Sequence, residues 1–187
     1  MSGRFVAVVG PSGVGKDSLI LYARERLGDG GKFHFVRRVV TRPADGNTED
    51  HDTLTPVEFA AAEARGHFAL SWDAHGLRYG LPIAIEDDLR AGKVVIANLS
   101  RRMIPALVER YPDAVVVLVT ATRDVIATRL ANRGRETIES IQARLARKVD
   151  DHLPANTVRI DNSGELQQAG KKFVSMLQDC AGLVEHP

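Results

Sequence analysis

The densest group of residues able to do chemistry lies at positions 10–19, which read GPSGVGKDSL. The spacing G-x-x-x-x-G-K is typical of a loop whose backbone N–H groups surround nucleotide phosphates, while the lysine reaches the β- and γ-phosphates. A glycine turn with only a structural role is the alternative. The candidates for binding the phosphates of ATP are Gly10, Pro11, Ser12, Gly13, Val14, Gly15 and Lys16.

The residue after the lysine departs from this pattern. A serine or threonine, whose hydroxyl binds Mg²⁺, normally follows, but here Asp17 does, and Ser18 comes one place late. Mg²⁺ prefers hard oxygen ligands, so we expect Asp17 to contact it directly or through a water, with Ser18 assisting. The alternative is that Asp17 only caps the helix and that Ser18 is the ligand.

Arginines gather further along the chain, in RLANRGRETIESIQARLAR at positions 129–147. Residues four apart share one face of a helix, and a glycine then permits a turn before a second helix. A lid over about residues 125–150 would place positive charge over a moving phosphoryl group and exclude water. The candidate catalytic residues are Lys16, Arg129, Arg133 and Arg144. The alternative is a solvated helical face on which the arginines pair with Glu136 and Glu139.

A third cationic group comes from RRVVTRP at positions 37–43 and RYG at positions 78–80. Arg38 and Arg42 near Tyr79 would suit the phosphate group of an acceptor molecule. Edge strands also carry such charges to prevent aggregation, and the sequence alone leaves both interpretations open.

Valine-rich runs alternate with helical patterns and define the elements that must position these residues. Short continuous apolar runs are typical of strands buried on both faces, and strand–helix alternation predicts a parallel α/β sheet with the glycine-rich loop at the carboxyl end of the first strand. The predicted strands are 4–9, 94–97, 114–119 and 157–161, and the predicted helices are 16–27, 101–110, 123–133 and 165–177.

The stretch from about 35 to 92 breaks this alternation. Its candidate strands 35–41 and 67–72 mix apolar and polar residues, and TPVEF predicts a helix with Thr55 as N-cap, proline at the first position and Glu58 completing a capping box. Residues 43–52 read PADGNTEDHD and predict an acidic, turn-rich loop. We therefore expect an inserted β-rich subdomain.

The chain has 44% hydrophobic and 26% charged residues. This composition predicts that residues 1–187 form one soluble domain. The net charge of +1 provides no basic field for nucleic acid, and no apolar run approaches the ~20 residues of a membrane span. The single cysteine excludes an intramolecular disulfide. We expect a cytoplasmic protein with small-molecule substrates; the sequence leaves its oligomeric state open.

Four segments together resemble the guanylate-kinase branch of P-loop kinases: GPSGVGK, VVTRPAD, GLRYG and RLANRGR, in the same order over nearly the whole chain. The resemblance implies a central parallel sheet flanked by helices, an inserted acceptor-binding subdomain and a short helical lid. The guanine-reading positions differ. His51 and Leu70 stand where that family has a tyrosine and a glutamate, and Asn98 and Ser100 stand where it has two aspartates.

With these departures, the chain resembles the ribose 1,5-bisphosphate phosphokinases more closely. The segments that carry this resemblance are GPSGxGKDSL, RxxTR, LSWxAxGLxYG and NRGRE. That resemblance implies ATP-dependent transfer to the 1-phosphate of ribose 1,5-bisphosphate, giving 5-phosphoribosyl 1-diphosphate and ADP. The side chains of His51 and Trp72 would narrow the acceptor pocket to the size of a sugar phosphate. The expected acceptor-binding residues are Arg38, Arg42, Tyr79 and Asn98, and Asn162 is expected near adenine.

Two other functions stay open at this point. A guanylate or other nucleoside monophosphate kinase would use the same loop with a different acceptor. A non-catalytic guanylate-kinase-like interaction module would need neither Lys16 nor an arginine lid, so their joint presence disfavours it.

Overall fold

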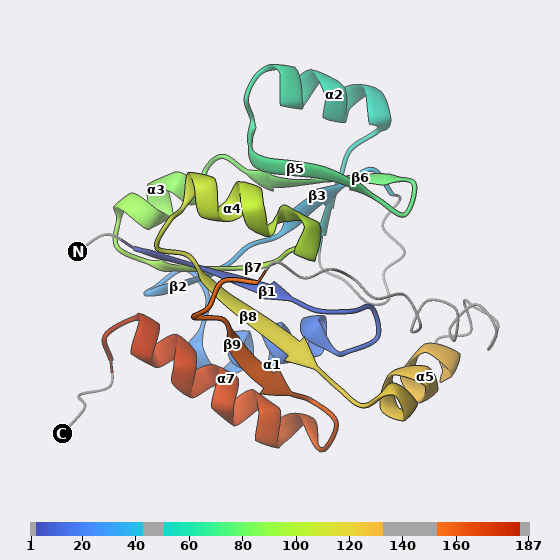
Figure 1. Ribbon diagram of the computed structural model, residues 1–187. Helices are drawn as coiled ribbons and strands as arrows, with labels where there is room; N and C mark the ends of the chain where they lie inside the picture. The colour runs from blue at the N-terminus through green and yellow to red at the C-terminus, as the bar shows by residue number, and fades with distance from the viewer. Residues whose placement is uncertain (1–2, 43–50, 133–152, 184–187) are drawn as a thin grey trace.

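The computed structural model describes residues 3–42, 51–132 and 153–183, and its centre is a five-stranded parallel sheet (Figure 1). The strand order is β2-β7-β1-β8-β9. The strands are β1 (Arg4–Val9), β2 (Phe33–Phe35), β7 (Val94–Asn98), β8 (Val115–Thr120) and β9 (Val158–Asp161). The predicted α/β class and all four predicted parallel strands are confirmed, and β2 is a fifth strand that the pattern did not indicate.

Helices cover both faces of this sheet because its strands are apolar on both sides. Val6 and Val8 of β1 pack with α1 (Lys16–Leu27), α5 (Arg123–Asn132) and α7 (Leu166–Cys180). Phe5 and Ala7, which point the other way, pack with α3 (Ile85–Arg90) and α4 (Ile104–Arg110). The result is a three-layer arrangement, visible in Figure 1.

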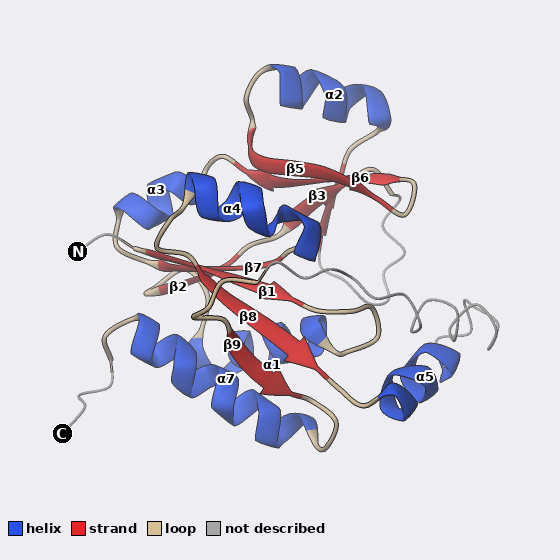
Figure 2. Ribbon diagram, viewed as in Figure 1, coloured by secondary structure: helices blue, strands red, loops and turns tan. Residues whose placement is uncertain are grey.

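A second, mixed sheet lies beyond α4 and has the order β4-β3-β6-β5 (Figure 2). Its strands are β3 (Arg38–Val40), β4 (His51–Thr53), β5 (Phe68–Ala74) and β6 (Leu77–Pro82), with α2 (Pro56–Ala64) beside them. The helix predicted at TPVEF is confirmed, because Thr55 accepts from the Glu58 backbone N–H while the Glu58 carboxylate accepts from the Thr55 backbone N–H.

The predicted strand at 35–41 is wrong as one element, since it belongs to two sheets. Phe35 pairs with Ile96 in the parallel sheet, and Arg38 begins β3 in the other. The last two residues of the predicted acidic loop, His51 and Asp52, lie in β4 and not in a loop, because they pair with Arg38 and Val39. Positions 43–50 of that loop lie outside the described residues.

Two helix predictions also change in detail. The segment predicted as one helix at 101–110 starts with a 3-10 turn at Arg101–Met103, and Pro105 falls in the first turn of α4. The short helix α3 was not predicted. No helix in the described residues combines the length and apolar character needed to cross a membrane.

Candidate functional site

The glycine-rich loop leaves the carboxyl end of β1 and turns into α1, as predicted. Three glycines take positive φ angles, 148° at Gly10, 82° at Gly13 and 93° at Gly15. At Gly15 a Cβ atom would lie 2.4 Å from the Asn162 amide nitrogen, and at Gly13 it would lie 2.7 Å from Leu130 Cγ. Both the conformation and the close approach therefore require glycine here.

Lys16 lies across this loop. Its ammonium donates to the carbonyl oxygens of Gly10 at 2.9 Å and Pro11 at 3.1 Å. Both of these acceptors are uncharged backbone carbonyl oxygens of the loop itself. The lysine is therefore held where a triphosphate would follow the loop.

The carbonyl of Val14 is the point at which two distant side chains hold the loop. Asn162, at the end of β9, donates to it from Nδ2 at 2.8 Å, and Arg129 of α5 donates from Nη1 at 3.2 Å. Asn162 is 2% exposed, and its Oδ1 has no hydrogen-bond partner among the described residues. The structure thus brings Arg129 to the loop; Arg133 and Arg144 lie outside the described residues.

Asp17 is the second residue of α1, next to Lys16, and its Oδ1 accepts from Asn98 Nδ2 at 2.5 Å. Asn98 ends β7 and is 9% exposed, whereas Ser18 is exposed. Carboxylate and hydroxyl oxygens are the hard ligands that Mg²⁺ prefers, so each of these two side chains has the chemistry to bind that ion. Sequence reasoning missed the contact between Asp17 and Asn98, since it joins residues 81 positions apart.

Arg38 connects the second sheet to this arrangement. Its Nη1 donates to the Asn98 carbonyl at 3.4 Å, and its guanidinium lies 5.5 Å from the centroid of the Tyr79 ring. Tyr79 stacks in turn on Trp72, with centroids 5.4 Å apart and planes 9° apart. Arg38, Tyr79 and Trp72 thus form one continuous contact beside the end of β7.

Arg38 is affected by a carboxylate and by a second guanidinium group. Burial lowers the pKa of Arg38 below its ordinary value, the negative charge of Asp17 opposes that lowering, and the positive charge of Arg42 adds to it. Two guanidinium groups close enough to perturb each other are stabilised by a bound anion, which reduces their repulsion. The structure therefore brings together Arg38, Arg42 and Tyr79 as predicted from the sequence.

The residues that stand where guanylate kinases are expected to contact guanine lie in different environments. His51 is 6% exposed and pairs with Arg38 across β3 and β4. Leu70 is 8% exposed and packs in the core cluster that Trp72 adjoins. Ser100 precedes the 3-10 turn after β7. Leu70 and Trp72 therefore present apolar surface on the Tyr79 side of the sheet.

A separate groove of about 590 Å³ lies beside β2 and α3 and includes none of the loop residues. Lys93 lies 2.7 Å from Asp88 and Arg37 lies 3.0 Å from Asp52, so these two cations are matched with carboxylates. His34 also contacts Asp88, at 2.6 Å. Neutralised charges of this kind favour a structural role, so the groove is the weaker candidate.

Comparisons with known proteins cover nearly the whole chain. No protein-family model matches the chain. Proteins named ribose 1,5-bisphosphate phosphokinase PhnN are similar to it: the one from Chelativorans sp. (strain BNC1) is 51% identical, covering 96% of this chain and 87% of its own. That from Brucella melitensis is 50% identical, with 96% and 94% covered, and that from Burkholderia pseudomallei 47%, with 95% and 97%.

A crystal structure of guanylate kinase from Anaplasma phagocytophilum superposes with a TM-score of 0.70 and 16% identity, covering 95% of this chain and 86% of that one. At this identity the likeness concerns the fold alone. The shared architecture includes a central sheet whose first strand leads into the glycine-rich loop in this chain.

Proposed function

The chain belongs to the ribose 1,5-bisphosphate phosphokinase family, and from this premise we propose how its residues divide the reaction. The family reaction transfers a phosphoryl group from ATP to the 1-phosphate of ribose 1,5-bisphosphate and gives 5-phosphoribosyl 1-diphosphate and ADP. We assign ATP to the glycine-rich loop and Lys16, and the acceptor to Arg38, Arg42 and Tyr79.

The observation that carries this assignment is the junction at Asn98. Its side chain contacts Asp17 at the nucleotide loop, and its carbonyl contacts Arg38 of the second sheet. The glycine-rich loop region and the guanidinium group of Arg38 therefore meet at one residue. This is the arrangement that transfer between two phosphate-bearing substrates requires.

The chemistry needs charge neutralisation more than proton transfer. A phosphate monoester is already anionic near pH 7, so the acceptor oxygen needs no general base, and the barrier arises from bringing two anions together. Lys16, Arg38 and Arg42 offset the ground-state charge. Arg129 donates to the neutral Val14 carbonyl in this structure, and in the reaction it moves to the transferring phosphoryl group. Arg133 and Arg144, which are not among the described residues, assist Arg129 in this proposal.

We assign the metal to Asp17 and Ser18, whose oxygens suit Mg²⁺. When bound, Mg²⁺ neutralises part of the charge on the phosphates of ATP. One Asp17 oxygen accepts from Asn98, which leaves the other for the ion or for one of its waters. Asn162 supports the loop through Val14, and a contact with adenine from the same position is part of the proposal.

Acceptor choice follows from what the Tyr79 side of the sheet offers. A site that reads a nucleobase needs buried polar groups matched to the base edge, and such groups give strong discrimination. Leu70 cannot hydrogen-bond through its side chain, and Trp72 occupies the space beside Tyr79. We therefore propose that GMP and AMP are poor acceptors. A cytoplasmic location is part of the same proposal.

The test is an ADP-release assay with MgATP and three acceptors: ribose 1,5-bisphosphate, GMP and AMP. We expect rapid ADP release with the sugar bisphosphate only. Release with GMP at a comparable rate would make the chain a guanylate kinase, and release with none of them would favour the non-catalytic module.

A further inference from the structure

We propose that Asn98 is a positioning residue for both substrates: its side chain sets the orientation of Asp17, and its backbone carbonyl anchors Arg38. This inference rests on the proposed function and changes the role that the sequence suggested for Asn98, which was a contact with the acceptor.

The register of the parallel sheet explains why position 98 is suited to this task. Asn98 lies opposite Val8 of β1, two residues before the loop begins at Gly10, and the next residue, Leu99, donates its backbone N–H to the Val8 carbonyl. The end of β7 is thus tied to the end of β1. A side chain at position 98 is held beside the first turn of α1.

The chemistry of the pair fixes its orientation. An ionised carboxylate accepts hydrogen bonds and cannot donate, so only the NH₂ end of an amide can face Asp17. Nδ2 of Asn98 lies 2.5 Å from Oδ1 of Asp17, and the amide is buried at 9% exposure. A charge-assisted bond of this kind, with a buried donor, restricts the rotamers that the carboxylate can adopt.

The backbone of the same residue reaches the acceptor side. Arg38 donates from Nη1 to the Asn98 carbonyl at 3.4 Å and also feels the charge of Asp17. Asn98 therefore lies between a carboxylate on the nucleotide side and a guanidinium on the acceptor side. Because it is part of a strand in the centre of the core, it holds both at a constant separation.

A role in positioning Asp17 predicts a metal-dependent defect. In Asn98→Ala the carboxylate loses its partner and samples other rotamers, which weakens Mg²⁺ binding by about tenfold, as loss of an outer hydrogen bond to a metal ligand typically does. Binding of a fluorescent ADP analogue should weaken in the presence of Mg²⁺ and stay within about threefold of the unmodified protein in EDTA. The Arg38 anchor is a backbone atom, so it survives the substitution.

Binding of the acceptor is measured independently through the fluorescence of Trp72. This residue is the one tryptophan of the chain, and it stacks on Tyr79. We expect the affinity for ribose 1,5-bisphosphate, read from Trp72 fluorescence, to change by less than about threefold in Asn98→Ala, since no contact to the acceptor is removed. A large loss of acceptor affinity with unchanged Mg²⁺-dependent nucleotide binding would overturn the inference and restore Asn98 as an acceptor contact.

Asn162→Ala is the matched control. It also removes a buried asparagine amide that bonds the loop region, but its partner is the Val14 carbonyl and not Asp17. We expect it to weaken ADP binding equally with Mg²⁺ and in EDTA. The same metal-independent pattern in Asn98→Ala would show a merely structural role and contradict the proposal.

The double variant Asp17→Asn with Asn98→Asp keeps an amide–carboxylate bond but reverses it. Thermal unfolding should return close to that of the unmodified protein, while the Mg²⁺ dependence of ADP binding stays impaired. Restored Mg²⁺ dependence would mean that only the bond matters, and would contradict the proposal.

If the unmodified protein shows no Trp72 response and no turnover with ribose 1,5-bisphosphate, the proposed function fails, and the ADP measurements still decide the role of Asn98.

Discussion

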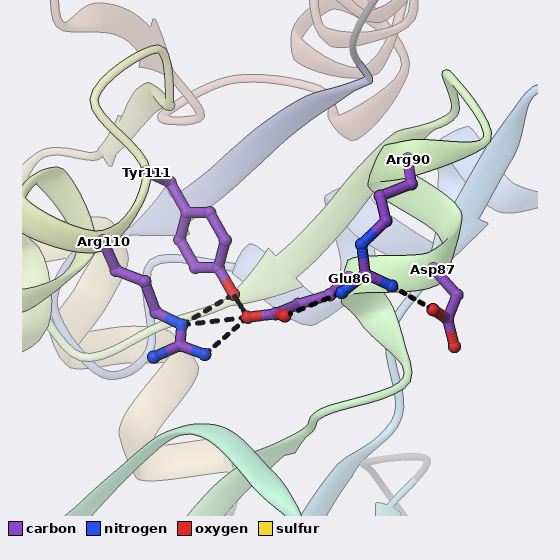
Figure 3. Close-up of polar contacts among 5 residues, drawn as sticks. All are labelled: Glu86, Asp87, Arg90, Arg110 and Tyr111. Carbon is purple, nitrogen blue, oxygen red and sulfur yellow. Dashed lines mark hydrogen bonds and ion pairs between the residues drawn. The ribbon is translucent and has the colours of Figure 1, made fainter.

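Two arginine-containing regions of this molecule hold cationic side chains through different kinds of contact. Between α3 and α4, Figure 3 shows Arg110 bound to the Glu86 carboxylate, with distances of 2.5 Å from Nη2 and 3.1 Å from Nε, and Tyr111 donating to the same oxygen at 3.2 Å. Arg90 reaches the other Glu86 oxygen at 3.2 Å and also pairs with Asp87. Each arginine in this cluster has a carboxylate.

At the glycine-rich loop, the hydrogen bonds of the cations to the loop go to neutral acceptors. Lys16 donates to two carbonyl oxygens and Arg129 to a third. A phosphate oxygen that replaces a carbonyl gains charge–charge attraction, whereas one that replaced Glu86 would have to displace an existing ion pair. These bonds to neutral acceptors distinguish the loop from the ion-paired cluster between α3 and α4.

The largest expected effect comes from removing the central cation of the loop. Lys16→Ala should lower kcat by about 10³, because a preorganised donor to the transferring phosphates is lost. Lys93→Ala is the matched control, since Lys93 contacts Asp88 at 2.7 Å in the separate groove. Steady-state kinetics with MgATP compares the two; equal losses in both variants would remove the distinction between the regions.

Arg129 should give the next largest effect. Arg129→Ala is expected to lower kcat by about 10² with little change in ATP affinity, because its contact with the transferring group forms only in the transition state. Arg129→Lys should recover part of the rate, as it keeps the charge and loses the planar fork. Parallel losses in ATP affinity and rate would make Arg129 a ground-state ligand.

The comparison for Arg129 is sharpened by Arg110→Ala in the cluster between α3 and α4. We expect this variant to keep kcat within about twofold, since surface substitutions away from the site act mainly on stability. A rate loss matching that of Arg129→Ala would show that the paired arginines also serve catalysis.

A substitution of Asp17 tests whether its carboxylate, next to the glycine-rich loop, is placed to bind Mg²⁺. Asp17→Ala should raise the Mg²⁺ concentration for half-maximal rate by about tenfold, because an oxygen ligand or its anchor is lost. Asp124→Ala, which removes an exposed aspartate from the first turn of α5, controls for the helix dipole. Unchanged Mg²⁺ dependence in Asp17→Ala would leave Ser18 as the ligand.

The smallest effect is expected from the neutralised cluster and concerns stability alone. Hydrogen bonds from Arg110 lower the pKa of Glu86 below its ordinary value. The ionised carboxylate therefore stabilises the fold above that ordinary value, and the contribution is lost as the pH falls through the lowered one. Glu86→Gln should lower the free energy of unfolding by about 1 kcal/mol at pH 7.

Urea unfolding of Glu86→Gln at pH 7 and at acidic pH measures this contribution. The difference from the unmodified protein should shrink as the pH falls, and kcat at pH 7 should stay unchanged. A difference that is constant with pH would mean that shape and not charge sets the contribution of Glu86.

Local patterns predicted much of the fold because the decisive information was local. The valine-rich strands, the helix at Lys16–Leu27 and the capping box at Thr55 each depend on residues within one turn or one strand. The split between β2 and β3 was missed because one continuous stretch of mixed apolar and polar residues supplies both, and the change of sheet depends on pairing with Ile96. The six residues of α3 were too few to show a helical period.

The candidate site shows the same limit. The loop, Arg38 and Tyr79 were found from motifs, and the structure brings them together. The bond from Asn98 to Asp17 and the Trp72–Tyr79 stack depend on strand register, which no short motif encodes. The roles of Arg133 and Arg144 remain predictions, since both positions lie outside the described residues.

The most direct measurement of the central claim is a competition between acceptors in one tube. The enzyme receives equal concentrations of ribose 1,5-bisphosphate and GMP with limiting γ-³²P-labelled MgATP, and the labelled products are separated by chromatography. Their ratio is the ratio of kcat/KM, and we expect the sugar diphosphate to exceed GDP by at least about 10³, because two or three polar contacts to a base are missing. Comparable amounts of the two products would contradict the account.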